Sequence, residues 1–473
     1  MAQLHELDAM AQAAAVRARE VSPVELVEHH LERAERYGEG LGVFLTVTAE
    51  AAREQAKEAE RQVREAQEPD ALPPLFGVPT AIKDLNPTAG VRTTFGSRAY
   101  ADFTPAGDGY AVALLRAAGT ISIGKTNTPE FGLSAYTDND LAGPARSPWD
   151  TTRTAGGSSG GAAAAVAAGI VPFAHGSDGG GSLRIPASCC GIVGFKPSRG
   201  RVSNGPLGSD VTGMPVQGPL SRTVRDAAAM LDAMAVPQTG DPYWAPPLPD
   251  GESFLDHAGR EPGRLRIGVY THPGIEGVDV DPEILDAHRA AAELLASLGH
   301  EVEEIDNPFG DSLRKPFMGV WAGQSLQMKV GDEAQLRPLT RWWREAGRGL
   351  SAEQYNDALY GLQSAARRGV RKMAAYDAVL APTLAVLPHA TDWFEAEGPA
   401  EAARRQMGYS CFTAAYNATG QPAVSLPLRW TAAGVPVGVM LAGRPAGEAQ
   451  LLSLSAQIEA ARPWADRRPE LDR

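Results

Sequence analysis

Two serine–glycine clusters and one lysine are the residues of this chain best suited to chemistry. Ser182 directly follows three glycines, Gly179, Gly180 and Gly181, and Ser158 lies upstream within the cluster 156–161. Because glycine has no Cβ, the backbone N–H groups of such a run can turn toward one point, as a tetrahedral oxyanion requires. Together with Lys83, these serines predict a hydrolase that uses a serine nucleophile.

The residues after Ser182 predict a helix. Apolar side chains follow at helical spacing, at Leu183, Ile185 and Ala187. We therefore expect Ser182 to open a helix whose N-terminal dipole adds to the positive field around the serine.

Lys83 is the candidate base, because no histidine is marked by its sequence context. A lysine acts as a base only when neutral, which at pH 7 requires its pKa of about 10.4 to fall by roughly three units. Lys83 ends the apolar stretch 77–82, which predicts a buried strand and a buried amine. From this residue alone, a surface lysine paired with Asp84 remains the alternative.

The first cluster also fits a different catalytic motif. Residues 156–160 match the Gly-x-Ser-x-Gly nucleophile elbow, which would make Ser158 the nucleophile, with Asp377 as the acid and His389 as the base. An elbow follows a strand, whereas residues 150–155 form a polar segment without strand alternation and predict a loop. This Ser-His-Asp esterase is therefore our second interpretation of the cluster.

A third motif predicts no function. Residues 119–126 match the phosphate-binding loop pattern, but that loop must follow a strand and open a helix. Here the residues between the two glycines themselves predict a strand, and Pro129 follows soon after. Nucleotide binding is therefore not expected.

Composition narrows the class of protein. The 473 residues carry a net charge of -13, which argues against nucleic acid or an anionic membrane as partner. Three cysteines, of which Cys189 and Cys190 are adjacent, provide neither a disulfide framework nor a zinc site, and we expect that pair to pack in the core. The chain shows no apolar leader, and its small-residue run 161–174 is too short to span a bilayer. We expect a cytoplasmic protein.

The hydrophobic pattern divides the chain at about residue 66. Residues 1–66 predict peripheral helices, whereas from Leu75 short apolar runs alternate with helical segments. Such alternation predicts an α/β fold with a buried sheet and helices on both faces. Residues 317–375 predict further helices that carry Trp321, Trp342 and Trp343.

Three motifs in order resemble those of the amidase signature family. They are Gly77-Val78-Pro79-x-x-x-Lys83-Asp84, Gly156-Gly157-Ser158-Ser159-Gly160-Gly161, and the run from Gly176 to Pro186. The resemblance continues through residues 124–130, 191–201, 376–383 and 417–423, and so covers nearly the whole chain. It implies one α/β/α domain with a twisted mixed sheet, in which residues 67–473 form the amidase core and helices 1–66 pack on it. It also implies amide hydrolysis with no metal or organic cofactor.

The resemblance assigns roles by motif position. Ser182 would be the nucleophile, Lys83 the base, and Ser158, on a cis peptide bond, the residue that relays the proton between them. Backbone N–H groups of Gly179, Gly180, Gly181 and Ser182 would form the oxyanion hole. Ser159 and Ser177 would be supporting donors, with Asp178 and Arg184 as structural partners of the loop.

Substrate class is the finer expectation. Family members usually carry Thr, Ile or Ala where Gly179 stands, so the loop here is looser and the pocket wider. Residues 174–206 resemble those of bacterial amidases that cleave nylon-type oligomers and aryl amides, some of which also cleave carbamates. We expect a small amide or carbamate as the substrate, urethane and ester cleavage as side activities, and a monomer or homodimer. The alternative within the family is a glutamine-hydrolysing subunit of a tRNA-dependent amidotransferase.

Overall fold

One large mixed β-sheet organises the part of the chain that the computed structural model describes, residues 3–206, 208 and 210–471. Within these residues eleven strands form the sheet, in the order β1-β3-β2-β6-β8-β7-β12-β13-β11-β9-β10, and β4 and β5 pair separately. The strands are β1 (Phe44–Val47), β2 (Pro79–Lys83), β3 (Ile121–Thr126), β4 (Arg146–Ser147), β5 (Asp150–Thr154), β6 (Phe173–Asp178), β7 (Val193–Lys196), β8 (Val216–Ser221), β9 (Arg266–Val269), β10 (Glu301–Glu304), β11 (Ala378–Pro382), β12 (Ala423–Trp430) and β13 (Pro436–Gly443).

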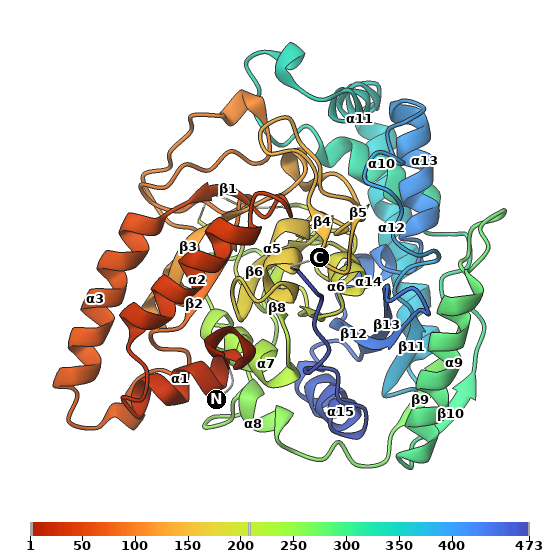
Figure 1. Cartoon of the computed structure of the whole chain (residues 1–473). Coiled ribbons are helices and arrows are strands. Elements are labelled where there is room, and N and C mark those ends of the chain that lie inside the picture. Colours follow the sequence, from red (N-terminus) through yellow and green to blue (C-terminus); the bar gives the residue numbers. More distant parts are fainter. Residues whose placement is uncertain (1–2, 207, 209, 472–473) are drawn as a thin grey trace.

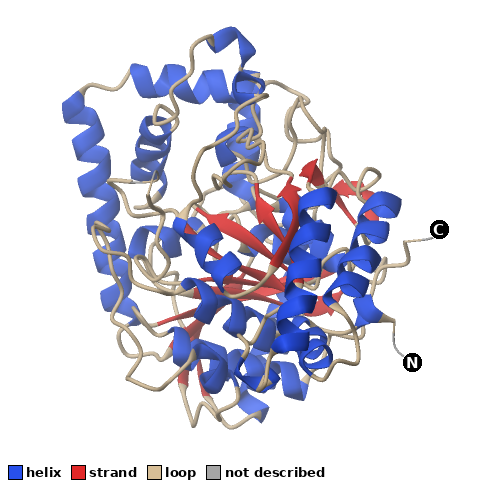
Figure 2. Ribbon diagram, turned by 90° about the vertical axis from the view of Figure 1, so that its left-hand side faces the viewer, coloured by secondary structure: helices blue, strands red, loops and turns tan. Residues whose placement is uncertain are grey.

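Helices cover both faces of this sheet (Figure 2). They are α1 (Ala9–Arg17), α2 (Pro23–Tyr37), α3 (Ala49–Glu65), α4 (Tyr110–Ala117), α5 (Gly160–Ala167), α6 (Arg184–Cys190), α7 (Val224–Met234), α8 (Phe254–Ala258), α9 (Pro282–Ser297), α10 (Arg314–Gln324), α11 (Pro338–Arg348), α12 (Ala352–Met373), α13 (Pro399–Tyr409), α14 (Ala414–Thr419) and α15 (Glu448–Ala461). The predicted α/β class, with a mixed sheet between helical layers, is confirmed. None of the described helices combines the length and apolar character needed to span a bilayer.

Adjacent residues of the central strands face opposite helical layers. In β2, Ala81 packs in the core formed with α2, α3 and α5, whereas Ile82 packs in the core formed with α4, α7 and α15. In β6, Ala174 packs in the first of these cores and Phe173 in the second. This period of two is the expected result of strand geometry, and it makes both faces of these strands apolar.

Strand direction brings two chain segments to the same edge of the sheet. β2 runs parallel to β6, with Ile82 opposite His175, and parallel to β3 on its other side. Because the carboxyl ends of parallel strands meet at one edge, Lys83 at the end of β2 lies near Asp178 at the end of β6. β6 pairs antiparallel with β8 on its other side, which makes the sheet mixed.

Helix α5 is built only from small residues and is buried throughout. All eight of its residues, from Gly160 to Ala167, are buried. A Cβ on Gly160 would lie 2.5 Å from the Thr137 hydroxyl, and one on Gly161 would lie 2.5 Å from the Val43 carbonyl oxygen. The helix therefore packs at a distance that larger side chains would not allow.

Three segments test the predicted elements. Residues 121–126 form β3, so the segment that matches a phosphate loop is a strand, as predicted. The prediction of a loop before Ser158 was wrong, because Asp150–Thr154 forms β5 and pairs with β4. This hairpin lies outside the main sheet and its first four residues are at least partly exposed, so it needs no apolar alternation. The predicted helices of residues 1–66 also include β1, which pairs antiparallel with β3 at the edge of the sheet (Figure 1).

Candidate active site

Lys83 is a buried lysine that contacts two serine hydroxyls. Its Nζ donates to Ser158 Oγ at 2.8 Å and to Ser177 Oγ at 3.0 Å. Its side chain has no exposed surface. The surface-lysine alternative is therefore wrong: Asp84 pairs instead with the buried Lys125, at 3.4 Å.

Burial decides the charge of this lysine. It lowers the pKa of the Lys83 ammonium to about 7, although the negative charge of Asp178 opposes the shift. A substantial fraction of Lys83 is therefore neutral at neutral pH. A neutral amine that contacts a serine hydroxyl can accept a proton from it.

Ser158 is placed by the turn between β5 and α5. The peptide bond between Gly157 and Ser158 is cis. The next residue, Ser159, joins this turn to the end of β6, because its Oγ donates to the Ser177 carbonyl oxygen at 3.1 Å and accepts from the Ser177 N–H at 3.3 Å. The Ser159 N–H also donates to the Ser182 carbonyl oxygen at 3.2 Å. These bonds bring Ser158, Ser177 and Ser182 into one site.

Asp178 fixes the glycine loop that precedes Ser182. Its carboxylate accepts from the N–H of Gly181 at 2.7 Å and of Leu183 at 3.1 Å. Helix α6 begins only at Arg184, so the expectation that Ser182 opens the helix was wrong. Leu183 is the N-cap of α6, and Asp178 satisfies the amides on either side of Ser182, so Ser182 belongs to the capping segment that precedes the helix.

A buried ion pair anchors this carboxylate. Arg184 donates to both oxygens of Asp178, each at 2.9 Å, and neither side chain is exposed. Asn417 Nδ2 adds a hydrogen bond to Asp178 Oδ1 at 2.9 Å. Burial alone would raise the pKa of Asp178, but the charge and hydrogen bonds of Arg184 hold it well below its usual range.

The loop amides differ in what they bind. Gly181 N–H is engaged by Asp178, whereas the N–H groups of Gly179, Gly180 and Ser182 have no acceptor within the described part of the chain. Ser182 keeps 6% of its surface exposed. The nucleophile candidate is therefore buried but not fully enclosed, and the amides of Gly179, Gly180 and Ser182 itself are free to bind an oxyanion.

An apolar cavity adjoins the glycine loop. It has a volume of about 70 Å³, and Gly180 forms part of its wall. The other walls come mainly from apolar residues of three segments, Tyr270–Ile275, Phe309–Phe317 and Met407–Ala415. Phe317 and Trp321 of α10 stack with ring centroids 5.3 Å apart and lie over Gly180 and Gly179. Trp343, by contrast, is buried in the core.

The alternative Ser-His-Asp site is not assembled. Ser158 Oγ accepts from Lys83. His389 stacks on Trp393 with ring centroids 3.7 Å apart, and Asp377 pairs with Arg444 at 3.0 Å. The esterase interpretation therefore has no support in the geometry.

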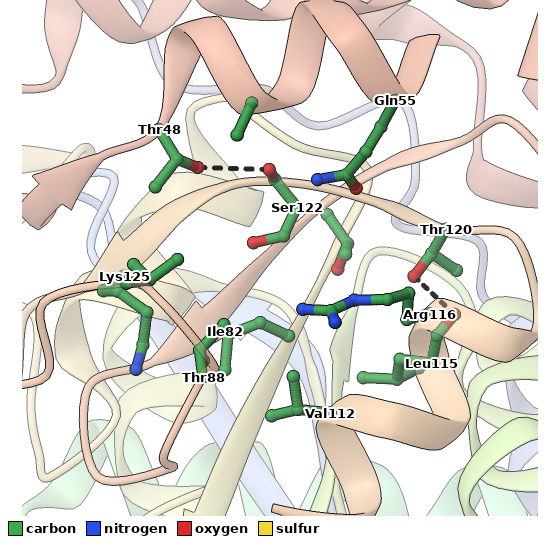
Figure 3. Close-up of a pocket in the computed structure, with 13 residues that line it drawn as sticks. Thr48, Gln55, Ile82, Thr88, Val112, Leu115, Arg116, Thr120, Ser122 and Lys125 are labelled. Carbon is green, nitrogen blue, oxygen red and sulfur yellow. Dashed lines mark hydrogen bonds between the residues drawn. The ribbon is translucent and has the colours of Figure 1, made fainter. Parts of the chain in front are cut away.

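A second cavity is lined by residues of α3, β2, β3 and α4 and of the loops that join them (Figure 3). It has a volume of about 40 Å³, and its described lining includes Thr48, Ser122 and Lys125 but none of the candidate catalytic serines. Thr120 at its edge donates to the Leu115 carbonyl oxygen at 2.9 Å. No group of three or more His, Cys, Asp or Glu among the described residues is arranged to hold a metal ion.

Sequence reasoning missed two residues that reach the loop from the end of the chain. Asn417 contacts Asp178, and Thr413 Oγ1 donates to the Gly180 carbonyl oxygen at 2.6 Å. Asn417 belongs to a motif that the family resemblance included, so a signal for it was present. Thr413 lies 233 residues from Gly180 in the chain, and no local pattern marks it.

Known proteins are similar to this chain in both sequence and fold. The family model "Amidase" matches residues 25–452. An acylamidase of Rhodococcus erythropolis is 35% identical over 98% of this chain and 98% of its own length. The 6-aminohexanoate-cyclic-dimer hydrolase of Paenarthrobacter ureafaciens is 35% identical over 98% of this chain and 96% of its own. A solved 6-aminohexanoate cyclic dimer hydrolase superposes with a TM-score of 0.91 over the full length of both chains, at 33% identity. The chain belongs to the amidase signature family of amide-cleaving hydrolases.

Proposed function

We propose that this protein is a serine amidohydrolase that cleaves secondary and aryl amides through an acyl-enzyme. Ser182 is the nucleophile, Ser158 the proton relay and Lys83 the base. The observation that carries the proposal is the contact of 2.8 Å between the buried Lys83 amine and the Ser158 hydroxyl. A lysine with a pKa of about 7 is suited to general base catalysis near neutral pH.

The reaction then runs in two halves. Neutral Lys83 takes the Ser158 proton while Ser158 takes the proton of Ser182, whose oxygen attacks the amide carbon. As the C–N bond breaks, the proton returns through Ser158 to the departing amine, and an ester to Ser182 remains. Water then attacks this ester while the same base takes a proton from the water. This step releases the carboxylic acid and restores the Ser182 hydroxyl.

The oxyanion of each tetrahedral intermediate needs donors close to Ser182. The N–H groups of Gly179, Gly180 and Ser182 supply them in this proposal, since no described residue accepts from them. The Gly181 N–H, which the family resemblance assigned to the oxyanion hole, donates to Asp178, so its role in this proposal is to hold the loop. Donors of this kind act strongly because they are fixed before the charge develops.

The substrate class follows from the cavity and the relatives. An apolar cavity beside Gly180 favours substrates with an apolar acyl or amine group. An acylamidase and a 6-aminohexanoate-cyclic-dimer hydrolase are among the similar proteins, which supports anilides and nylon-type cyclic or linear amides as substrates. We propose carbamates and esters as secondary substrates, because they present a similar carbonyl group.

A substrate panel with four variants tests this proposal. Anilides, a nylon-type oligomer and a carbamate are given to wild type, Ser182→Ala, Ser158→Ala, Lys83→Ala and His389→Ala. We expect the first three variants to lose activity on every substrate and His389→Ala to retain it. Retention by Ser182→Ala, or release of ammonia from glutamine only with partner subunits, would refute the proposal.

A further inference from the structure

One peptide group of the glycine loop is held at both ends. The carbonyl oxygen of Gly180 accepts from Thr413 Oγ1 at 2.6 Å, and the N–H of Gly181 in the same peptide donates to Asp178 Oδ1 at 2.7 Å. The Ser410 carbonyl oxygen lies 3.0 Å from the same hydroxyl, so Gly180 is the nearer of its two acceptors. In a trans peptide the C=O and the N–H point in opposite directions, so these two bonds fix the rotation of the plane. The plane adjoins the N–H groups of Gly180 and Ser182 on either side.

These bonds belong to a closed ring of hydrogen bonds. The backbone oxygen of Thr413 accepts from Arg184 Nη1 at 2.8 Å, and Arg184 in turn holds Asp178. Asn417 links two members of this ring, because its amide group donates to Asp178 and accepts from Arg184 at 2.7 Å. Asp178, Arg184, Thr413 and Asn417 are all essentially buried, so solvent does not compete for these bonds.

Thr413 is the member of the ring whose side chain contacts the Gly180–Gly181 peptide from the far end of the sequence. Figure 1 places α14, which follows Thr413 directly, beside α6. A Cβ on Gly181 would lie 2.3 Å from the Thr413 hydroxyl, which shows how closely the threonine is packed on the loop. Its neighbours Cys411, Phe412 and Ala414 line the apolar cavity beside Gly180.

We propose that Thr413 is a positioning residue, whose hydroxyl fixes the Gly180–Gly181 peptide and so aims the flanking amides of Gly180 and Ser182 at the oxyanion. This inference rests on the proposed function. Without the hydroxyl, the Gly180 carbonyl oxygen loses its donor and the plane can rotate. Such a rotation weakens binding of the transition state more than binding of the substrate.

The test compares variants that differ in one hydroxyl. Thr413→Val keeps the shape of the side chain and removes the hydroxyl donor. Thr413→Ala removes both the hydroxyl and the methyl group, whereas Thr413→Ser removes only the methyl group, so the difference between these two variants measures the effect of the hydroxyl. For an anilide substrate we expect Thr413→Val and Thr413→Ala to lower kcat by about 10- to 100-fold with KM changed less than about threefold. Thr413→Ser should stay within about threefold of wild type, because it retains the donor.

Thr120→Val is the matched control. Thr120 is also buried, and its hydroxyl also donates to a backbone oxygen, that of Leu115 (Figure 3). It precedes β3, whereas the glycine loop follows β6, so the two lie at opposite ends of these parallel strands. We expect it to lower thermal stability while kcat stays unchanged. Equal losses of kcat in Thr413→Ser and Thr413→Ala, or a wild-type kcat in Thr413→Val, would overturn the role of Thr413.

Ser182→Ala in the same assay separates this inference from the proposed function. If Ser182→Ala retains activity, the proposed function fails. If Ser182→Ala is inactive and the Thr413 variants match wild type, only the positioning role fails.

Discussion

Gly179 and Trp321 are packed on each other where α10 lies over the glycine loop. A Cβ built on Gly179 would lie 3.5 Å from the Trp321 ring, which is ordinary van der Waals contact, so any longer side chain would push against the indole. Gly179 therefore leaves space for the Trp321 ring that a side chain longer than alanine would occupy.

The effect of a substitution at Gly179 on substrate preference should therefore increase with the size of the new side chain. Gly179→Ala adds only a contact and should keep kcat/KM within about threefold, whereas Gly179→Ile should displace Trp321 and lower kcat/KM for bulky anilides by about tenfold or more. Kinetics on a small and a bulky anilide measure the change.

A double substitution checks that Trp321 is the cause. Trp321→Ala in the Gly179→Ile background removes the clash, so activity on bulky anilides should recover in part. If the loss of kcat/KM in the double variant, expressed as a free energy, equals the sum of the losses in the two single variants, the two residues do not act together.

Gly181→Ala should be far more damaging than Gly179→Ala. Gly181 has a φ of 137°, a conformation that side chains rarely adopt, and its Cβ would lie 2.3 Å from the Thr413 hydroxyl. We expect a loss of about 1–3 kcal/mol in the free energy of unfolding and a large loss of kcat. Denaturant unfolding and anilide kinetics test both; equal stability of the two alanine variants would contradict the packing argument.

The activity should depend on pH through Lys83. A base works in its neutral form, and the pKa of Lys83 is lowered to about 7, so kcat/KM should fall about tenfold per pH unit below 7 and level off above about 8. A pH–rate profile on a non-titrating anilide measures this, with thermal unfolding at each pH as the control. A flat profile from mildly acidic to alkaline pH would exclude Lys83 as the base.

The adjacent cysteines should take no part in catalysis. Cys189 and Cys190 have no exposed surface, as the sequence predicted, and burial raises the pKa of Cys189 to about 12. Mild alkylation of the folded enzyme should leave its activity intact. The assay uses a Cys411→Ala background, because Cys411 lines the cavity beside Gly180. Inactivation in that background would show that one of the buried thiols is reachable and required.

The sequence predicted what depends on neighbours in the chain. The strand that ends at Lys83 follows from the local apolar pattern, and it is found. The start of α6 was predicted two residues too early, because Asp178 satisfies the amides of Gly181 and Leu183. Only the folded chain shows that an aspartate takes this place.

Contacts between distant segments were beyond prediction. Thr413 and Arg184 meet across 229 residues, and no period or motif around Thr413 indicates a partner in the glycine loop. The strand β5 was missed for a local reason. It pairs only with β4, and most of its residues are at least partly exposed. It therefore lacks the apolar alternation by which strands are recognised in a sequence.

Helix α5 also limits where this enzyme can be altered. It holds the turn of Ser158 in place, and its eight buried small residues leave no space for an added methyl group at Gly160 or Gly161. Phe317 of α10, by contrast, borders a cavity, so a change in its side-chain volume meets open space. Directed evolution toward new amides should therefore accumulate accepted substitutions on the α10 side and almost none along α5.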